Sequence, residues 1–387
     1  MGNNKQKRLM DKSLLSKNYV VAVVGATLFY TAAYMANAVC GKYAISLGAS
    51  NTVSGFAVAV FTLASFISRP LWGWVVDRYS RRFISLLGGV MCFSASLLLV
   101  FSNTITTLFV SRMVFGRGYS AFSTASATVI CDIVPESKLS QAISVYGVTG
   151  VLAGAVAPGL ALWLFDMGHI LLAVTVAAIT AFVPLLFLMV RYNEKQFLNP
   201  QTTFAIWEKT SLPAAYTIFF FALSSASVNS FIPVMAQERN IAADGVFFLV
   251  SAVFMLVVRF INTRLTDSLG PQKLFYIADI IYTAAFLILA VTHNNLFLML
   301  SAALYGIGAG VIHPIVNTAA VSRCNPEKRG LATATFMMSQ DLGMTAGAAS
   351  WGYVSETFGF TAVYFVVALL MLVMMYVFYR FLSRILK

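Results

Sequence analysis

The chain has 387 residues, of which 59% are hydrophobic and only 10% are charged, whereas soluble domains contain about 25% charged residues. This composition excludes an ordinary soluble protein. Three stretches, Val20–Gly41, Phe83–Ser111 and Ile170–Val190, contain no charged residue, and each exceeds the roughly 20 residues that an apolar helix needs to cross a bilayer. The sequence therefore predicts an all-α integral membrane protein with the lipid bilayer as a partner.

Hydropathy predicts twelve membrane-spanning helices. They are expected at residues 18–41, 51–73, 83–101, 105–131, 140–165, 169–190, 212–237, 244–263, 273–292, 295–320, 330–354 and 359–381. If the N-terminus is cytoplasmic, the inner segments hold 20 of the 26 Lys and Arg residues, in agreement with the positive-inside rule. The net charge of +12 thus reports topology rather than nucleic-acid binding. We expect the cytoplasmic (inner) cell membrane, with both termini in the cytoplasm.

The N-terminal tail, residues 1–17, carries five basic residues before the first span. It resembles the n-region of a signal peptide, but the apolar run that follows is too long for an h-region and lacks a clear cleavage site. A retained anchor is therefore predicted. In the first span, Tyr30, Tyr34 and Asn37 share one face and are candidates to contact a substrate. Lys42, near the outer end, could attract an anion, although snorkelling to the interface is its default role.

The connection between the second and third spans reads SRPLWGWVVDRYSRRF, Ser68 to Phe83. Gly73 allows the second span to approach a neighbouring helix closely. Asp77 can meet the positive N-terminal end of a helix on the cytoplasmic side, and Arg81 can reach Asp132 at the inner end of the fourth span. The alternative interpretation is that these charges only set the topology.

The fourth span contains two arginines. Arg117 lies about twelve residues into the span, near mid-bilayer, on a polar stripe with Ser120 and Thr124 that is expected to meet water rather than lipid. These three residues are candidates to contact a substrate, and Arg117 could instead contact Asp341. Arg112 is shallower. A gating or proton-relay role and a structural tie to backbone carbonyls are both open for it.

The chain contains an internal repeat. A shift of 190 residues places Arg69 on Arg259 and Asp77 on Asp267, and it places the sequence GRG at residues 116–118 on GIG at 306–308. Six spans per half is an even number, so the two halves share one orientation in the membrane. The predicted organisation is an N-terminal six-helix bundle at 18–190, a cytoplasmic linker at 191–211 and a C-terminal six-helix bundle at 212–387. Asn229 takes the place of Asn37 in the second half.

These residues resemble the major facilitator superfamily of secondary transporters over the whole chain. The family motif Gly-x-x-x-Asp-Arg-x-Gly-Arg-Arg is matched in the loop after the second span, except that a serine stands at the second glycine, and Arg-x-x-x-Gly is matched in the fourth span. The matching residues are Gly73, Asp77, Arg78, Arg81 and Arg82, with Ser80 as the departure, and Arg112 with Gly116. The resemblance implies two pseudo-symmetric bundles around a central cavity. It also implies that Gly73, Asp77, Arg81, Asp132 and Asp267 latch the inner gate.

The fifth span is compared with the glycine-rich motif of the drug-exporting antiporters of this family. Ala153, Ala157, Pro158 and Ala161 keep small side chains there, but the diagnostic glycines are replaced. This degraded motif favours export only slightly.

Polar groups recur in the ninth and tenth spans. Asp279 is expected to pair with Arg259 or Arg264 rather than with a ligand. His313 and Asn317 lie one turn apart beside Pro314, and both are cavity candidates. His313 could titrate near neutral pH, or it could satisfy a backbone carbonyl that the proline leaves free.

Asp341 is the only charged residue between Gly330 and Val354. It lies eleven residues into the eleventh span, a depth of about 16 Å in a hydrocarbon core of roughly 30 Å. Ser339, Gly343 and Gly347 form a stripe suited to tight helix packing, and Asp341 points away from it. Because a charge at mid-bilayer facing lipid costs at least ~2.5 kcal/mol, we expect Asp341 to face the central cavity.

Three roles are open for Asp341. A carboxylate in a partly dry cavity can exchange a proton as water access alternates, it can pair permanently with a buried arginine, or it can bind a cationic substrate. Met337 and Met344 flank it and could adapt to varied ligands. The proton-coupling candidates are therefore Asp341, Arg112 and His313.

The resulting prediction is a secondary active transporter that works by alternating access of the rocker-switch type. Proton-coupled export of a small amphipathic or zwitterionic compound is the leading hypothesis, and proton-coupled import or exchange of a small organic anion is the alternative. No enzyme motif, ATP-binding motif or metal-ligand spacing occurs, and the four cysteines form no disulfide pattern. We expect no cofactor, no nucleic-acid partner and a functional monomer.

Overall fold

The computed structural model describes residues 16–49, 51–100, 104–198, 201, 203–241 and 244–382. Most of the predicted tail therefore lies outside the described residues. In the described part of the chain, every regular element is helical. The long helices are α2 (Lys17–Ala38), α4 (Asn51–Arg78), α5 (Arg81–Val100), α6 (Ile105–Asp132), α7 (Leu139–Met167), α8 (His169–Met189), α9 (Leu212–Glu238), α10 (Asp244–Leu269), α11 (Pro271–Val291), α12 (Asn295–Ser322) and α13 (Arg329–Val377), with α3 (Cys40–Ser46) as a short helix.

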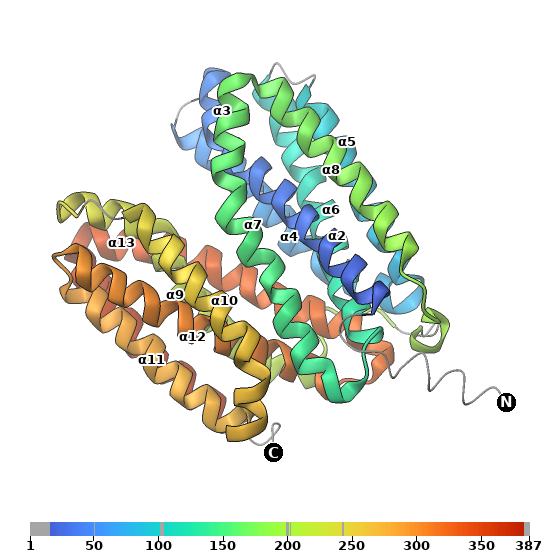
Figure 1. The fold of residues 1–387 in the computed structure, drawn as a ribbon. Coiled ribbons are helices and arrows are strands. Elements are labelled where there is room, and N and C mark those ends of the chain that lie inside the picture. The colour runs from blue at the N-terminus through green and yellow to red at the C-terminus, as the bar shows by residue number, and fades with distance from the viewer. Residues whose placement is uncertain are drawn as a thin grey trace. The chain divides into compact units, whose positions relative to one another are not determined.

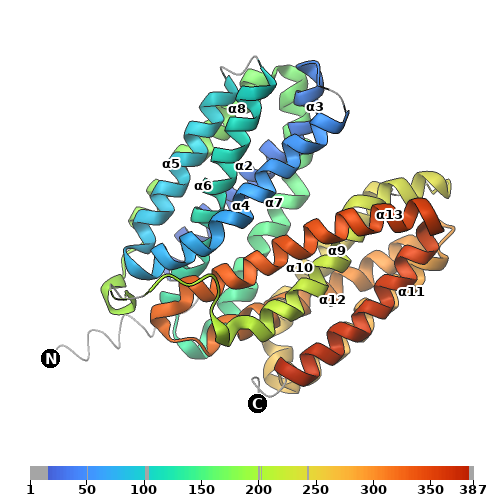
Figure 2. The same cartoon turned by 180° about the vertical axis from the view of Figure 1, so that it is seen from behind.

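The expected spans map onto these helices with one difference. The first span is interrupted at Val39, so that α2 and α3 are separate helices. The eleventh and twelfth spans share the label α13 but are two helices that meet at a kink, where the backbone of Gly359 is not helical. Gly359 has a φ of 77°, a conformation that glycine adopts without steric cost. Figure 2 shows the two arms of α13 meeting at this bend.

Ten helices of the described residues are long and apolar enough to cross a membrane. The doubled segment Pro326–Phe381 counts once among them, and α6 is not included, although it is 28 residues long. Two arginines and several serines and threonines make α6 less apolar than its neighbours. The all-helical membrane architecture predicted from composition is confirmed.

The contacts divide the chain into two units (Figure 1). Unit 1 comprises Met1–Ala142, Tyr146–Glu208 and Asn325–Ala334. Unit 2 comprises Ile143–Val145, Lys209–Cys324 and Thr335–Lys387. The predicted linker thus belongs almost entirely to unit 1, and so does the first turn and a half of α13.

The two units repeat the same helix packing. In unit 1, a Cβ on Gly116 of α6 would lie 2.4 Å from the carbonyl oxygen of Phe61 on α4. In unit 2, a Cβ on Gly306 of α12 would lie 2.3 Å from the carbonyl oxygen of Ser251 on α10. Both the glycines and their partners are separated by 190 residues. The sequence repeat therefore corresponds to the same close helix contact in both units: α6 against α4 in unit 1 and α12 against α10 in unit 2. Glycine is required at both contacts because a larger residue would push the two helices apart.

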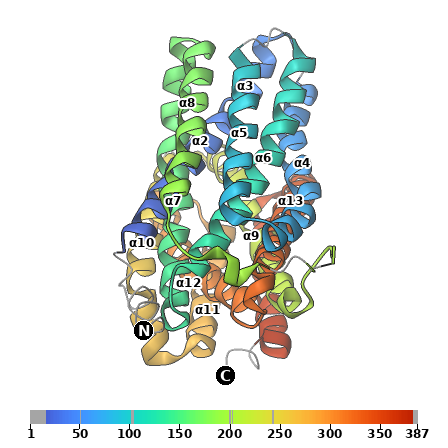
Figure 3. The ribbon, with the colours of Figure 1, turned by 90° about the vertical axis from the view of Figure 1, so that its right-hand side faces the viewer.

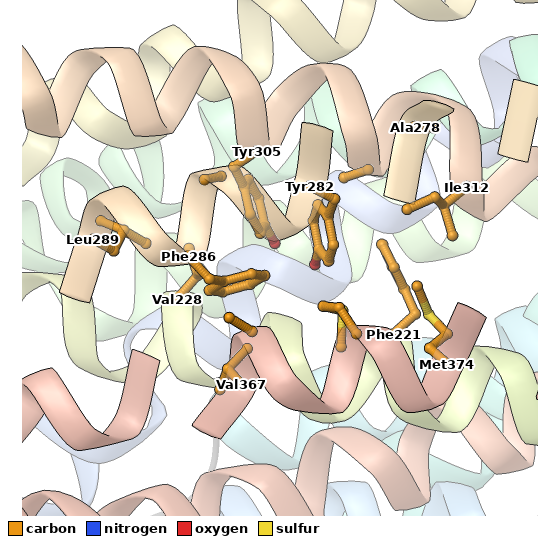
Figure 4. Packing of buried hydrophobic residues seen from close by; sticks show 14 of the residues in the cluster. Phe221, Val228, Ala278, Tyr282, Phe286, Leu289, Tyr305, Ile312, Val367 and Met374 are labelled. Carbon is orange, nitrogen blue, oxygen red and sulfur yellow. The ribbon is translucent and has the colours of Figure 1, made fainter. Parts of the chain in front are cut away.

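Each unit buries its own core. In unit 1, α5 packs along α6 and α8 (Figure 3). In unit 2, Tyr282 of α11 stacks on Phe221 of α9 and lies against Tyr305 of α12 (Figure 4). The Tyr282 hydroxyl lies 3.2 Å from the Ser224 hydroxyl and 3.0 Å from that of Ser225, so this buried phenol has hydrogen-bond partners.

Candidate functional site

Asp77 caps the start of α13 within unit 1. Its two carboxylate oxygens accept hydrogen bonds from the backbone N–H groups of Gly330 (2.7 Å) and Leu331 (2.8 Å). These N–H groups have no partner inside the helix, and the helix dipole favours a negative charge at this end. The contact that the sequence predicted for Asp77 is present, and it explains why a fully buried carboxylate is tolerated there.

A network of buried charges continues from this cap. Arg81 donates a short hydrogen bond to Asp132, lies 3.6 Å from Asp77 and donates to the carbonyl of Pro326 at 3.1 Å. Arg329 lies 3.6 Å from the other Asp132 oxygen and 3.5 Å from Glu136. The predicted pair of Arg81 and Asp132 is therefore formed. Arg329 was missed, because a basic residue before a span also fits a simple topology signal.

Gly73 shows the predicted close approach. A Cβ there would lie 2.6 Å from the Cβ of Ala334 and 3.0 Å from the Cα of Leu331, so any side chain would force α4 away from the start of α13. The equivalent acid in unit 2 behaves differently. Asp267 is exposed, and none of the ion pairs found among the described residues includes it. The latch-type contacts are thus formed around Asp77, and a gating role for Asp267 stays a prediction.

The linker after α8 is hydrogen-bonded to the loop between α4 and α5 that contains Ser80. Ser80, which stands where the family motif has glycine, donates a hydrogen bond to Glu194 at 2.7 Å and accepts one from the Phe83 N–H at 3.1 Å. Glu194 also accepts from the Arg82 N–H at 3.4 Å. The Arg82 guanidinium lies over the Tyr192 ring, and burial raises the pKa of the Tyr192 phenol well above its ordinary value. From the sequence, Ser80 is recognisable only as a departure from the motif.

The candidates on α2 are partly built into the core of unit 1. Tyr30 is buried, and its hydroxyl lies 3.2 Å from the hydroxyl of Tyr146, which lies 2.8 Å from that of Ser126. Tyr34 is half-buried and faces Gly150 and Gly154 of α7. The hydroxyl chain through Tyr146 and Ser126 was not predicted, because no periodic pattern marks it.

Arg112 has the environment that the structural interpretation predicted. Its guanidinium is 1% exposed and donates to the carbonyls of Ala57 (3.4 Å) and Ala36 (3.5 Å). It also donates to the side-chain oxygen of Asn37 and lies over the ring of Phe61. Asn37 is thus held by Arg112, whereas Asn229 at the equivalent position is exposed.

The polar stripe of α6 is only partly open to solvent or lipid. Arg117 and Met113 are exposed, but Ser120 and Thr124 are fully buried. The expectation that this stripe meets water is therefore wrong at those two residues. Ser120 donates to the carbonyl of Arg117 at 2.9 Å, and such bonds to its own helix let a hydroxyl be buried at low cost.

On α13, the small-residue stripe packs as expected. Ser339 donates to the carbonyl of Ala215 on α9 at 2.6 Å. Cβ atoms added at Gly343 and Gly347 would lie 2.4 Å from the Phe219 carbonyl oxygen and 2.6 Å from the Leu223 carbonyl oxygen. The stripe is therefore in backbone contact with α9.

Asp341 is half-buried and belongs to a different side of α13 from this stripe. Met337 and Met344 are half-buried as well and pack at the edge of the unit 2 core.

His313 has a side-chain partner. Its Nε2 lies 3.3 Å from Oε1 of Gln340, the residue before Asp341 on α13, and its ring packs edge-on against Phe221 and Phe336. The bond that the structure gives His313 is thus to a side chain and not to a freed carbonyl. Asn317, one turn along, is half-buried. Gln340 was missed because an uncharged amide gives no signal in an apolar run.

The expected pairing of Asp279 with an arginine is wrong, and Lys42 has a partner that was not expected. Asp279 is buried, yet no ion pair to it is found in the described part of the chain, and its Oδ1 has no hydrogen-bond partner there. Lys42 is exposed and pairs with Asp166 at 2.6 Å. Its snorkelling to the interface and its attraction of an anion both stay predictions.

Comparison with known proteins places the chain in a family. The Major Facilitator Superfamily profile matches residues 22–214 and again 214–386. The chain is 23% identical over 370 residues to the staphylopine export protein of Staphylococcus aureus, with 90% of this chain and 92% of that protein covered. It is also 23% identical over 376 residues to the multidrug resistance protein MdtG of a Rahnella species, with 92% and 91% covered.

The fold agrees with this assignment. The crystal structure of the human organic anion transporter MFSD10 (TETRAN) superposes with a TM-score of 0.79 at 16% identity, covering 92% of this chain and 98% of that one. This likeness concerns the fold. The two profile matches, one for each half of the sequence repeat, span nearly the whole chain, and the chain therefore belongs to the Major Facilitator Superfamily of multi-pass membrane transporters, among members with efflux-type relatives.

Proposed function

We propose that the chain exports a small amphipathic or zwitterionic compound in exchange for protons, by alternating access of the rocker-switch type. The observation that carries the proposal is the placement of Asp341. It is the one charged residue in 330–354, it is half-buried, and the neighbouring small residues occupy the contact with α9. In this proposal the Asp341 carboxylate is the group that exchanges protons during transport.

The names of two related proteins support export as the direction of transport. One is named for staphylopine export and another for multidrug resistance. Half-buried methionines beside Asp341 suit a ligand of variable shape, since the thioether is flexible and polarisable. Gln340, the residue before Asp341 on α13, lies 3.3 Å from His313 of α12, and these two side chains supply further hydrogen-bonding groups.

The test is transport in proteoliposomes with an imposed pH gradient, using the zwitterion norfloxacin and the lipophilic cation ethidium as probes. We expect the unmodified chain to move at least one probe across the membrane in the direction opposite to the flow of protons. The Asp341→Asn variant should lose this gradient-driven movement. Glu356→Gln, an exposed acid on the same helix, is the matched control and should transport normally. If Asp341→Asn keeps gradient-driven transport, Asp341 does not couple protons.

A second function is import or exchange of a small organic anion, coupled to protons. It is favoured by Arg117, which is exposed on α6 and could attract a carboxylate. Uptake of labelled benzoate into the same proteoliposomes tests it. Loss of uptake in Arg117→Ala, with ethidium and norfloxacin unaffected by the pH gradient, would favour this function over export.

A further inference from the structure

Unit 1 contains a pocket that the proposed transport function does not use. It lies at the end of the unit where α2 passes into α3, α5 and α7 end, and α6 and α8 begin. Its cavity volume is about 30 Å³, and it continues into space open to the surface, so that the empty space is about 420 Å³ in all. The lining residues come from six helices, α2, α3, α5, α6, α7 and α8, and from Val39 between α2 and α3. They are almost all apolar: Ala36, Val39, Cys40, Tyr43, Leu99, Leu108, Arg112, Phe165, Leu172, Ala173 and Val176.

One cation lies in this apolar lining. Arg112 is seven residues into α6, so it lies about 10 Å along the helix from Ile105, at the inner end of the pocket. Its hydrogen-bond partners are two backbone carbonyls and the side chain of Asn37. All of these are neutral, and the structure pairs Arg112 with no carboxylate anywhere among its described residues.

The uncharged acceptors around Arg112 do not neutralise its positive charge. A guanidinium stays protonated in proteins, and a buried cation without an anionic partner carries a desolvation cost that neutral acceptors offset only in part. The carbonyls fix where the guanidinium points, but they do not neutralise it. An anion that reached Arg112 would gain strong attraction, because charges interact strongly where water is excluded.

The walls restrict what kind of anion fits. Leu108, Leu172 and Val176 offer no N–H or O–H groups to replace the water shell of an inorganic ion. They do match the apolar body of an organic molecule. Since Arg112 supplies a single positive charge, the complementary ligand carries a single negative charge. Asp166, which follows the lining residue Phe165, is already paired with Lys42.

We propose that this pocket is a binding site for a small hydrophobic monocarboxylate, with the carboxylate on Arg112 and the aliphatic or aromatic body between α6 and α8. The site lies wholly within unit 1 and includes none of the residues of α13. It is therefore distinct from the Asp341 region, and its occupation does not depend on the proposed export of a zwitterion or cation.

The experiment measures binding of sodium hexanoate to the full chain in lipid nanodiscs by titration calorimetry at neutral pH. Hexanol, which has a similar apolar body without the charge, and sodium chloride are the comparison ligands. We expect saturable binding of hexanoate only. Saturable binding of hexanol with the same affinity, or equal binding of chloride that displaces hexanoate, would overturn the proposal.

A filling variant tests the location. Ala173→Phe places a ring into the pocket, and Val174→Phe adds the same ring on the exposed side of α8. Hexanoate should bind at least tenfold more weakly to Ala173→Phe and unchanged to Val174→Phe. Undiminished binding to a well-folded Ala173→Phe protein would overturn the assignment.

A measurement without substitution covers the case in which Ala173→Phe does not fold. A diazirine-bearing hexanoate analogue is photolysed with the unmodified chain, and the labelled peptides are mapped by mass spectrometry. Labels should fall on the pocket-lining parts of α6 and α8, around Leu108 and Leu172, and excess hexanoate should remove them. Labelling confined to other helices, or insensitive to hexanoate, contradicts the site.

Discussion

At the scale of single residues, Asp77 and Asp267 occupy the same position in the two repeats, but their surroundings differ. Asp77 is buried and receives two backbone N–H groups from the start of α13, whereas Asp267 is exposed. The same residue type at the same repeat position therefore has two different energetic roles. Burial makes the difference, because a carboxylate removed from water depends on its partners.

Asp77→Ala should weaken the contact between α4 and the start of α13. The change leaves two N–H groups and Arg81 without their anion, and removal of one partner of a buried charge pair costs about 3–5 kcal/mol. We expect a lower melting temperature and faster alkylation of Cys131, which is buried beside Asp132. Asp267→Ala is the matched control and should change neither quantity appreciably. Equal effects of the two substitutions would contradict this account.

Gly343 and Gly352 make a second comparison on one helix. A Cβ at Gly343 would lie 2.4 Å from the Phe219 carbonyl oxygen, whereas at Gly352 the nearest atom would be the Phe231 ring at 3.7 Å. Gly343→Ala should therefore destabilise unit 2 by separating α13 from α9. Gly352→Ala should be neutral or stabilising by up to about 1 kcal/mol, since alanine favours helix more than glycine does.

Thermal melting of the two purified variants checks this prediction. A Gly343→Ala protein as stable as the unmodified chain would mean that α13 and α9 can move apart at no cost. In that case the placement of Asp341 relative to α9 would not depend on the small-residue stripe.

At the scale of elements, the linker is held by Ser80 to the loop between α4 and α5. The serine caps α5 and bonds to Glu194. The position 190 residues later is Gly270, which has a φ of 78°. Among the described residues only Asn240 combines a side chain with a positive φ, so Ser80 is free of that strain. A side chain is tolerated in the first repeat because the backbone there differs.

Ser80→Ala should loosen both the start of α5 and the linker. Loss of a capping hydroxyl costs about 1 kcal/mol, and Glu194 loses its donor at the same time. We expect faster hydrogen exchange at the amides of residues 82–84 and 192–195. Ser80→Gly keeps much of the capping preference and should loosen mainly the linker. Ser94→Ala, whose hydroxyl is exposed and bonds only to its own helix, is the control, and the proposal fails if it has the same effect.

At the scale of the whole molecule, the distribution of Lys and Arg predicts that both termini are cytoplasmic. Alkaline phosphatase fused after Lys387 should therefore be inactive, because the enzyme needs the oxidising compartment outside the cytoplasm. A truncated fusion after His293, in the connection between α11 and α12, should be active. Fluorescence of green fluorescent protein at the same two points gives the opposite pattern. Reversed activities would require the opposite orientation.

Much of the fold could be predicted from the sequence because its physical causes are local. Apolar runs of membrane length dictate helices, and the 190-residue shift between Arg69 and Arg259 anticipated the paired contacts of Gly116 and Gly306. The contacts of Asp77 and Arg81 were predicted as well, since a helix N-terminus attracts a carboxylate and Asp132 lies at the inner end of the neighbouring span.

The rest was decided only by tertiary structure. Sequence alone determined that this chain is a helical membrane protein of two repeated halves with one lone acid, Asp341, deep in a span. It could not determine that Ser120 and Thr124 are buried, that Asp279 lacks an arginine, or that Arg112 lines an apolar pocket. Those outcomes depend on which faces of different helices meet, and that choice is made by packing between segments far apart in the chain.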